Sequence, residues 1–177
     1  MIKRLFNSMY PHASLWLMLG SILTLAAAYV FQYGFHYAPC DLCYLQRYPY
    51  MVTAALGAIF LVLEGNKENF RFSSLGMAIL GLMIIALFYD AGVAIYHVGV
   101  EQKWWQGPSE CSSTIDMTLT GEALLEAIMN APLVKCDEVQ WSLFGVSMAG
   151  YNAIIALSLA SFGTASFLKN MADKKSA

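Results

Sequence analysis

Residues 13–35 read ASLWLMLGSILTLAAAYVFQYGF, a stretch without a charged side chain. Three further apolar stretches of similar length follow, at residues 44–63, 75–96 and 143–168. Arg47 and Asp90 are the only charged residues within the four stretches. About 20 helical residues, each rising about 1.5 Å, cross a hydrocarbon core of about 30 Å. Because the stretches lack the alternation of polar and apolar residues typical of barrel strands, we predict four transmembrane helices.

The composition supports a membrane protein. Of the 177 residues, 58% are hydrophobic and 12% are charged, whereas soluble domains carry about 25% charged residues. A net charge of −2 without a basic tract argues against a nucleic acid partner. We therefore predict an all-α membrane protein, a single integral domain over residues 1–177 that folds as a four-transmembrane-helix bundle. We expect helices at about residues 13–35, 41–63, 73–97 and 142–168, with a short first outer loop at 36–43 and a long second one at 97–141.

The first stretch also has features of a secretory signal peptide. Lys3 and Arg4 precede it, and residues 26–28 are three alanines that resemble a cleavage site. The apolar run nevertheless continues beyond the alanines to Phe35, which is long for the apolar part of a cleaved signal. We expect this segment to be retained as the first helix.

The distribution of basic residues predicts the orientation in the membrane. One side would carry seven lysines and arginines, namely Lys3, Arg4, Lys67, Arg71, Lys169, Lys174 and Lys175. The side with the two loops would carry only Lys103 and Lys135. The positive-inside rule then places both termini in the cytoplasm and both loops in the periplasm or exterior.

All four cysteines lie on the loop side, and two of them form the motif Pro39-Cys40-Asp41-Leu42-Cys43 at the start of the second helix. A helix N-terminus and a nearby cation lower the pKa of a thiol, which favours the thiolate used in disulfide exchange. Arg47 follows Cys43 by one helical turn on the same face. The motif indicates a redox-active couple. The alternative is a structural disulfide or a free dithiol, with Arg47 extending to the lipid headgroups.

The other two cysteines, Cys111 and Cys136, lie in the long loop. Apolar residues at helical spacing within residues 119–130 predict a short amphipathic helix on the membrane surface. A disulfide between these cysteines could be a plain staple, or it could exchange with the other pair on the same side. A zinc site that uses His36 or His97 is disfavoured, because the long cysteine separation is not typical of zinc ribbons. We expect no metal.

Further motifs accompany the cysteines. They are Cys40-x-x-Cys43-x-x-x-Arg47 before the second helix, Tyr96-His97 at the end of the third, Cys136-x-x-x-Gln140-Trp141 before the fourth, and Trp104-Trp105-x-Gly107-Pro108 ahead of Cys111. Together they resemble the disulfide bond formation protein B (DsbB) family, the four-helix thiol:quinone oxidoreductases of the bacterial inner membrane. The resemblance covers essentially the whole chain, including the cysteine order and the number of helices.

The resemblance implies a relay of disulfide exchange. A periplasmic thioredoxin-fold thiol oxidase (DsbA-like) would attack the Cys111–Cys136 disulfide through Cys111. The freed Cys136 would attack at Cys40 and leave Cys43 as a thiolate beside a membrane quinone, either ubiquinone or menaquinone. Two electrons would then pass to the quinone.

The resemblance also implies a quinone site in which Arg47 holds the quinone and His97 lies near the same ring. Asp90 lies about two helical turns before His97, on roughly the same face. A carboxyl group within a transmembrane helix is a candidate functional residue. Asp90 could pair with Arg47, relay protons to the reduced quinone, or be protonated and hydrogen-bonded between helices.

Two rival functions remain open at this point. A vitamin K epoxide reductase-like enzyme would perform the same chemistry on a similar bundle, but there the loop cysteines precede the Cys-x-x-Cys motif. In this chain they follow it, which disfavours that family. The rival from another class is a non-enzymatic four-helix membrane protein whose loops are held by two structural disulfides.

Overall fold

Helices make up most of the structure. The computed structural model describes residues 8–66, 70–108, 120–122, 125 and 134–176. Its elements are η1 (Tyr10–His12), α2 (Ala13–Tyr29), the π-helical turn η2 (Val30–Gly34), α3 (Asp41–Leu45), α4 (Arg47–Asn66), η3 (Phe70–Phe72), α5 (Ser74–Glu101), β1 (Ser142–Leu143), β2 (Val146–Ser147) and α8 (Met148–Ser176).

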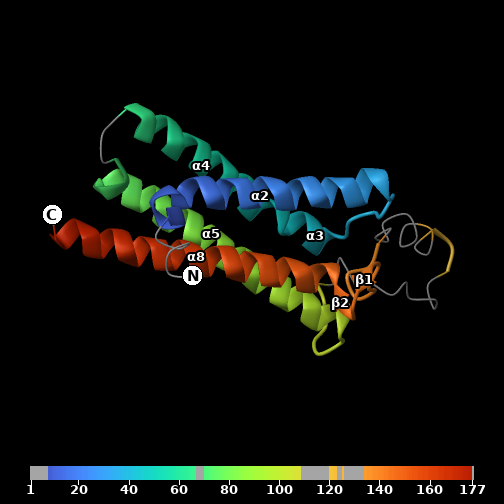
Figure 1. Ribbon diagram of the computed structural model, residues 1–177. Coiled ribbons are helices and arrows are strands. Elements are labelled where there is room, and N and C mark those ends of the chain that lie inside the picture. Colours follow the sequence, from blue (N-terminus) through green and yellow to red (C-terminus); the bar gives the residue numbers. More distant parts are fainter. Residues whose placement is uncertain (1–7, 67–69, 109–119, 123–124, 126–133, 177) are drawn as a thin grey trace.

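Four long helical segments run along the molecule and pack side by side (Figure 1). Each is long and apolar enough to cross a membrane: Tyr10–Gly34, Asp41–Asn66, Ser74–Glu101 and Met148–Lys175. Helix α5 packs against α4 and α8, and α2 packs against α4 and α8. The predicted four-helix membrane bundle is therefore confirmed. The start of α2 and the end of α8 lie toward one end of the bundle, whereas α3 and the two strands lie at the other.

Apolar side chains occupy both the interior and the outer face of this bundle. Leu17, Met83 and Leu87 are fully buried between the helices. Leu23 and Ile85 point outward and are 69% and 65% exposed. Large apolar side chains over a whole surface are unfavourable in water but not in lipid. The outer face of the bundle is thus suited to hydrocarbon.

The second transmembrane segment is interrupted near its start. Helix α3 ends at Leu45, and α4 begins at Arg47. Pro49 accounts for this break, because its nitrogen has no hydrogen to donate to the carbonyl of Leu45 and its ring crowds that carbonyl.

The fourth helix begins later than residue 142, where the sequence analysis placed its start. Strands β1 and β2 form an antiparallel hairpin there, with Ser142 opposite Ser147. Phe144 and Gly145 form its turn with φ values of 51° and 78°. Positive φ at both central residues is typical of the tight turns that join two strands. Most of the amphipathic helix predicted at residues 119–130 lies outside the described residues.

The close approach of α2 and α4 leads to a stability prediction. A Cβ atom at Gly57 would lie 2.6 Å from the Cβ atom of Met18. We expect Gly57→Ala to lower the free energy of unfolding by about 1–3 kcal/mol, because the two helices must move apart. A Cβ atom at Gly65, also in α4, would meet nothing within 4 Å, so Gly65→Ala is the matched control. Thermal unfolding in detergent checks the prediction, and equal Tm values for the two variants would contradict it.

Candidate active site: a dithiol couple beside an apolar cavity

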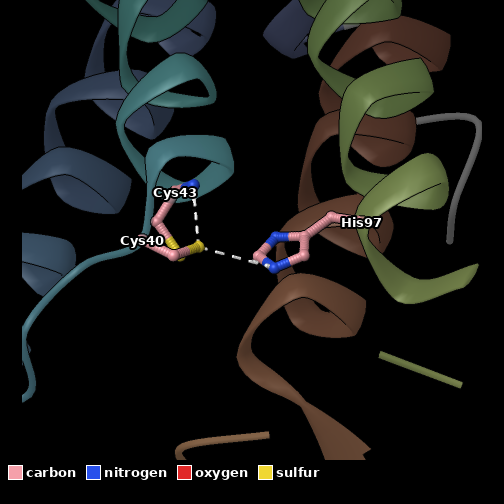
Figure 2. A group of neighbouring side chains, drawn as sticks. All are labelled: Cys40, Cys43 and His97. Atoms are coloured by element: carbon pink, nitrogen blue, oxygen red, sulfur yellow. Dashed lines mark hydrogen bonds between the residues drawn. The ribbon is translucent and has the colours of Figure 1, made fainter. Parts of the chain in front are cut away.

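The Cys-x-x-Cys motif lies where the second transmembrane segment begins (Figure 2). Cys40 caps α3, and its Sγ accepts a hydrogen bond from the backbone N–H of Cys43 at 3.4 Å. The Cys40 thiol donates to Sγ of Cys43 over 3.0 Å. Both cysteines are present as free thiols. The helix start thus directs the two sulfur atoms toward each other, as reversible disulfide formation requires.

Cys136 from the long loop lies against the motif. It is 1% exposed and shares a small buried cluster with Cys40, Leu42 and Val100. Its side chain forms a hydrogen bond with that of Cys40. The fold therefore brings one cysteine of the loop pair to the first cysteine of the motif, as exchange between the pairs requires. Cys111 lies outside the described residues.

His97 approaches the couple from α5, on the side opposite α3 (Figure 2). Its Nε2 lies 3.6 Å from Sγ of Cys40, and its Nδ1 lies 2.9 Å from Nε2 of Gln46. Nε2 is also 4.0 Å from Oε1 of Glu101, one turn further along α5. Glu101 in turn accepts a hydrogen bond from the hydroxyl of Ser147 in the hairpin. His97 is thus a direct neighbour of the dithiol.

Cys40, Cys43 and His97 also form a set of potential metal ligands. The two sulfur atoms and a ring nitrogen lie within 4.8 Å of one another, close enough to hold one ion. Thiolate and imidazole ligands suit zinc. The same two sulfurs are equally suited to disulfide chemistry, and the absence of a metal stays a prediction.

Arg47 is buried beside the couple. Its Nη1 donates a hydrogen bond of 2.6 Å to Oε1 of Gln32. The guanidinium group also lies over the rings of Tyr29 and Tyr44, 5.0 and 4.9 Å from their centroids. Stacking and hydrogen bonding together hold a planar cation in one orientation. At 8% exposure, Arg47 does not extend outward in the way the alternative interpretation required.

A cavity of about 310 Å³ adjoins the dithiol. Cys43, Arg47 and His97 all border it. Most of its remaining wall is apolar or aromatic, including Leu25, Ala28, Phe31, Trp141, Leu143 and Ile155. Apolar walls with a few fixed polar groups are typical of small-molecule sites. The cavity therefore suits a flat, apolar molecule whose polar atoms meet the cation, the imidazole and a thiol.

Buried polar side chains lead from His97 into the bundle. Gln46 contacts His97, and its Oε1 accepts a 2.7 Å hydrogen bond from Nδ2 of Asn152. The same Nδ2 donates to Oδ2 of Asp90 at 3.1 Å. The hydroxyl of Tyr50 donates to Oδ1 of Asn152 at 2.7 Å. These bonds link α4, α5 and α8, and Gln46, Tyr50 and Asn152 also line the cavity.

This arrangement disfavours one of the alternatives for Asp90, the pairing with Arg47. Asp90 is fully buried and bonded to Asn152 of the neighbouring helix, whereas Arg47 bonds Gln32 instead. The sequence analysis did not single out Gln32, Gln46 or Asn152, because it searched the apolar stretches for charges. These residues could have been found in the sequence as uncharged amides within transmembrane helices, because a buried amide needs a hydrogen-bonding partner inside the membrane.

Comparison with known proteins identifies the family. The family described as "Disulfide bond formation protein DsbB" matches residues 11–165. The chain belongs to the DsbB family. An uncharacterised protein of Rickettsia prowazekii is 28% identical over 156 residues, covering 86% of this chain and 85% of that protein. The protein named disulfide bond formation protein B in Dechloromonas aromatica is 26% identical over 161 residues, covering 85% of this chain and 88% of that protein. No solved structure matches the chain significantly.

Membership of the DsbB family assigns a broad function. The chain is a multi-pass membrane protein of disulfide bond formation, with four helices able to span a membrane. As a member of this family, it is an oxidoreductase with redox-active cysteines, and it exchanges disulfides with a partner.

The environment of Cys40 in this DsbB-family protein leads to a prediction about pH. The contact with Cys136 lowers the pKa of the Cys40 thiol, but the hydrogen bond to Cys43 and burial outweigh it and raise the pKa to about 12. Because only the thiolate is alkylated readily, Cys40 should react slowly at neutral pH. Its alkylation rate should rise about tenfold per pH unit until that pKa is reached. Peptide mass spectrometry after iodoacetamide treatment measures this rate, and a plateau near the ordinary thiol pKa of about 8.5 would contradict the prediction.

Proposed function

We propose that this protein reoxidises a thioredoxin-fold dithiol oxidase (DsbA-like) and passes the two electrons to a membrane quinone. One observation carries the proposal. The Cys40–Cys43 couple contacts the loop cysteine Cys136 on one side and borders an apolar cavity with a buried arginine on the other. A carrier of electrons between a protein thiol and a lipid-soluble acceptor needs both contacts.

The proposed thiol steps balance in atoms and electrons. A thiolate of the partner attacks Cys111 of a Cys111–Cys136 disulfide and releases Cys136. Cys136 attacks Cys40 of the Cys40–Cys43 disulfide, and Cys43 leaves as a thiolate. The partner's second thiol then closes its own disulfide and frees Cys111, which re-forms the loop disulfide and releases Cys40. Two electrons now reside on the reduced Cys40–Cys43 couple.

The proposed transfer of electrons to a quinone is argued from the residues that line the cavity. A bound quinone, ubiquinone or menaquinone, supplies a two-electron acceptor that leaves as the quinol after taking up two protons. Cys43 borders the cavity and would deliver the electrons, closing the disulfide with Cys40. Arg47, fixed by Gln32 and by two tyrosine rings, would bind a carbonyl oxygen of the ring.

We further propose that the protein lies in the bacterial inner membrane with both termini in the cytoplasm. The end of α8 carries Lys169, Lys174 and Lys175, and positively charged ends remain on the cytoplasmic side. The cysteine end would then face the periplasm, where disulfides persist.

The contact between Cys136 and Cys40 favours a relay and argues against two inert structural disulfides. A purely structural disulfide does not need a cysteine of the other pair beside it. The vitamin K epoxide reductase-like alternative remains disfavoured by the order of the cysteines along the chain.

The test uses purified full-length protein in detergent, a reduced thioredoxin-fold oxidase, and short-chain ubiquinone or menaquinone analogues. We expect one quinol for each disulfide formed in the oxidase, followed by quinone absorbance and by thiol quantification. Folded protein that reduces neither quinone with this donor would contradict the proposal. Metal analysis of the same preparation tests the competing use of Cys40, Cys43 and His97, which predicts one retained zinc ion per chain.

A further inference from the structure

Three hydrogen bonds orient the amide of Asn152 in its buried network. Its Nδ2 donates to Oε1 of Gln46 and to Oδ2 of Asp90, at 2.7 and 3.1 Å. Its Oδ1 accepts the hydroxyl of Tyr50 at 2.7 Å. An amide nitrogen only donates and an amide oxygen only accepts. Rotating the Asn152 amide by a half turn would place its oxygen against Oε1 of Gln46 and Oδ2 of Asp90, the two oxygens that now accept from its nitrogen.

The orientation of Asn152 determines that of Gln46. Because Oε1 of Gln46 is taken by Asn152, Nε2 of Gln46 faces Nδ1 of His97 at 2.9 Å. That nitrogen only donates, so Nδ1 of His97 must be the acceptor and carries no hydrogen. A neutral imidazole then carries its hydrogen on Nε2. Nε2 faces Sγ of Cys40 at 3.6 Å and Oε1 of Glu101 at 4.0 Å, and the backbone carbonyl of Cys136 also accepts a hydrogen bond from the ring.

We propose that the Asn152–Gln46 amide pair fixes His97 as the Nε2–H tautomer, so that His97 donates to Cys40 and does not act as a base toward it. Asn152 and Gln46 are thus positioning residues that act on the thiols through His97. With this tautomer, the side-chain hydrogen bonds run from Asn152 through Gln46 and His97 to Cys40, and from Cys40 to Cys43.

The direction of this series of hydrogen bonds affects which sulfur of the reduced couple carries negative charge. A hydrogen donated by His97 leaves Cys40 its own hydrogen, which Cys40 donates to Sγ of Cys43. This hydrogen bond stabilises negative charge on Cys43, and both cysteines border the cavity. With the opposite tautomer, a bare Nε2 would accept the hydrogen of Cys40, and Cys43 would lose the hydrogen bond that stabilises its thiolate. This consequence for electron transfer rests on the proposed function, whereas the tautomer does not.

The first experiment measures the tautomer in the unmodified protein. Reduced, quinone-free, full-length protein with ¹⁵N-labelled histidine is examined by NMR in detergent, and the His97 signals are assigned by comparison with His12→Gln and His36→Gln variants. We expect a neutral His97 ring with hydrogen on Nε2 and a bare Nδ1. Hydrogen on Nδ1 would overturn the proposal.

The second experiment reverses the polarity of the network by exchanging an amide and a carboxyl group. In Asp90→Asn/Asn152→Asp, the side chain at position 152 is a carboxylate, and its oxygens only accept hydrogen bonds. Tyr50, Gln46 and the new amide at position 90 can all donate to it. Gln46 must then turn its oxygen toward Nδ1 of His97, and we expect the Nδ1–H tautomer. Asn66→Asp is the matched control, because within the described part of the chain the Asn66 amide bonds only the carbonyl of Val62, at the far end of α4. An unchanged tautomer in the exchanged variant would refute the proposed control by Asn152.

Alkylation provides an independent readout. We expect the rate of Cys43 modification by iodoacetamide at fixed pH to fall about tenfold in the exchanged variant, because one hydrogen bond to a charged sulfur is lost. Asn66→Asp should leave the rate unchanged. If the double variant does not fold, Asn152→Asp alone is measured in the same way with the same expected change. Wild-type protein that fails to reduce quinone would reject the proposed function, yet the NMR result would still decide the tautomer.

Discussion

Protein carrying Cys43→Ala is expected to reduce no quinone above the rate measured without protein. Cys40 and Cys43 both border the cavity, and in the proposed route the electrons leave through Cys43. Disulfide exchange requires a thiolate at the point of transfer, and Cys40 is held as a neutral thiol by its own contacts. Quinone absorbance with a reduced thioredoxin-fold oxidase as donor measures the loss.

A companion variant separates the two halves of the relay. Cys111→Ala should also abolish turnover with the oxidase, because the partner can no longer enter through the loop pair. With a small dithiol such as dithiothreitol as donor, Cys111→Ala should keep quinone reduction, whereas Cys43→Ala should not. Thermal unfolding of both variants in detergent controls for stability. Turnover retained by folded Cys43→Ala would remove the central argument for a relay through Cys43.

Replacing Arg47 should have the second largest effect, and mainly on the KM for quinone. Hydrogen bonds to a charged group contribute about 1.5–3 kcal/mol, which corresponds to roughly a 10- to 150-fold rise in KM for Arg47→Met. Arg47→Lys should recover only part of this loss, since an ammonium group cannot reproduce a planar guanidinium stacked over the rings of Tyr29 and Tyr44. Steady-state kinetics with varied quinone analogue gives the KM.

The control for Arg47 is another arginine that lies over an aromatic ring. The guanidinium of Arg71 lies 4.7 Å from the ring centroid of Phe72, and Arg71 does not line the cavity. Arg71→Met should leave the KM for quinone unchanged. Exchange between the cysteine pairs should also persist in Arg47→Met, as followed with dithiothreitol and mass spectrometry. An unchanged KM in Arg47→Met would place the quinone elsewhere.

The sequence by itself determined the features that depend on local composition and spacing. Four apolar stretches predicted four membrane helices, because helix length must match the thickness of a bilayer whatever the helices pack against. The Cys-x-x-Cys motif predicted paired thiols at a helix start, since Cys40 and Cys43 lie within one turn. The spacing also placed Arg47 one turn after Cys43, whereas its burial depends on how the helices pack.

The tertiary structure alone decided which distant groups meet. Cys136 packs on Cys40, and His97 reaches the same sulfur from another helix. The hairpin at Ser142–Ser147 replaced an expected helical start because the turn at Phe144 and Gly145 adopts positive φ. Hydropathy reports where each helix lies in the membrane but not how the helices are rotated about their axes. Rotation depends on packing and on buried hydrogen bonds such as Gln46–Asn152, which only the assembled bundle can form.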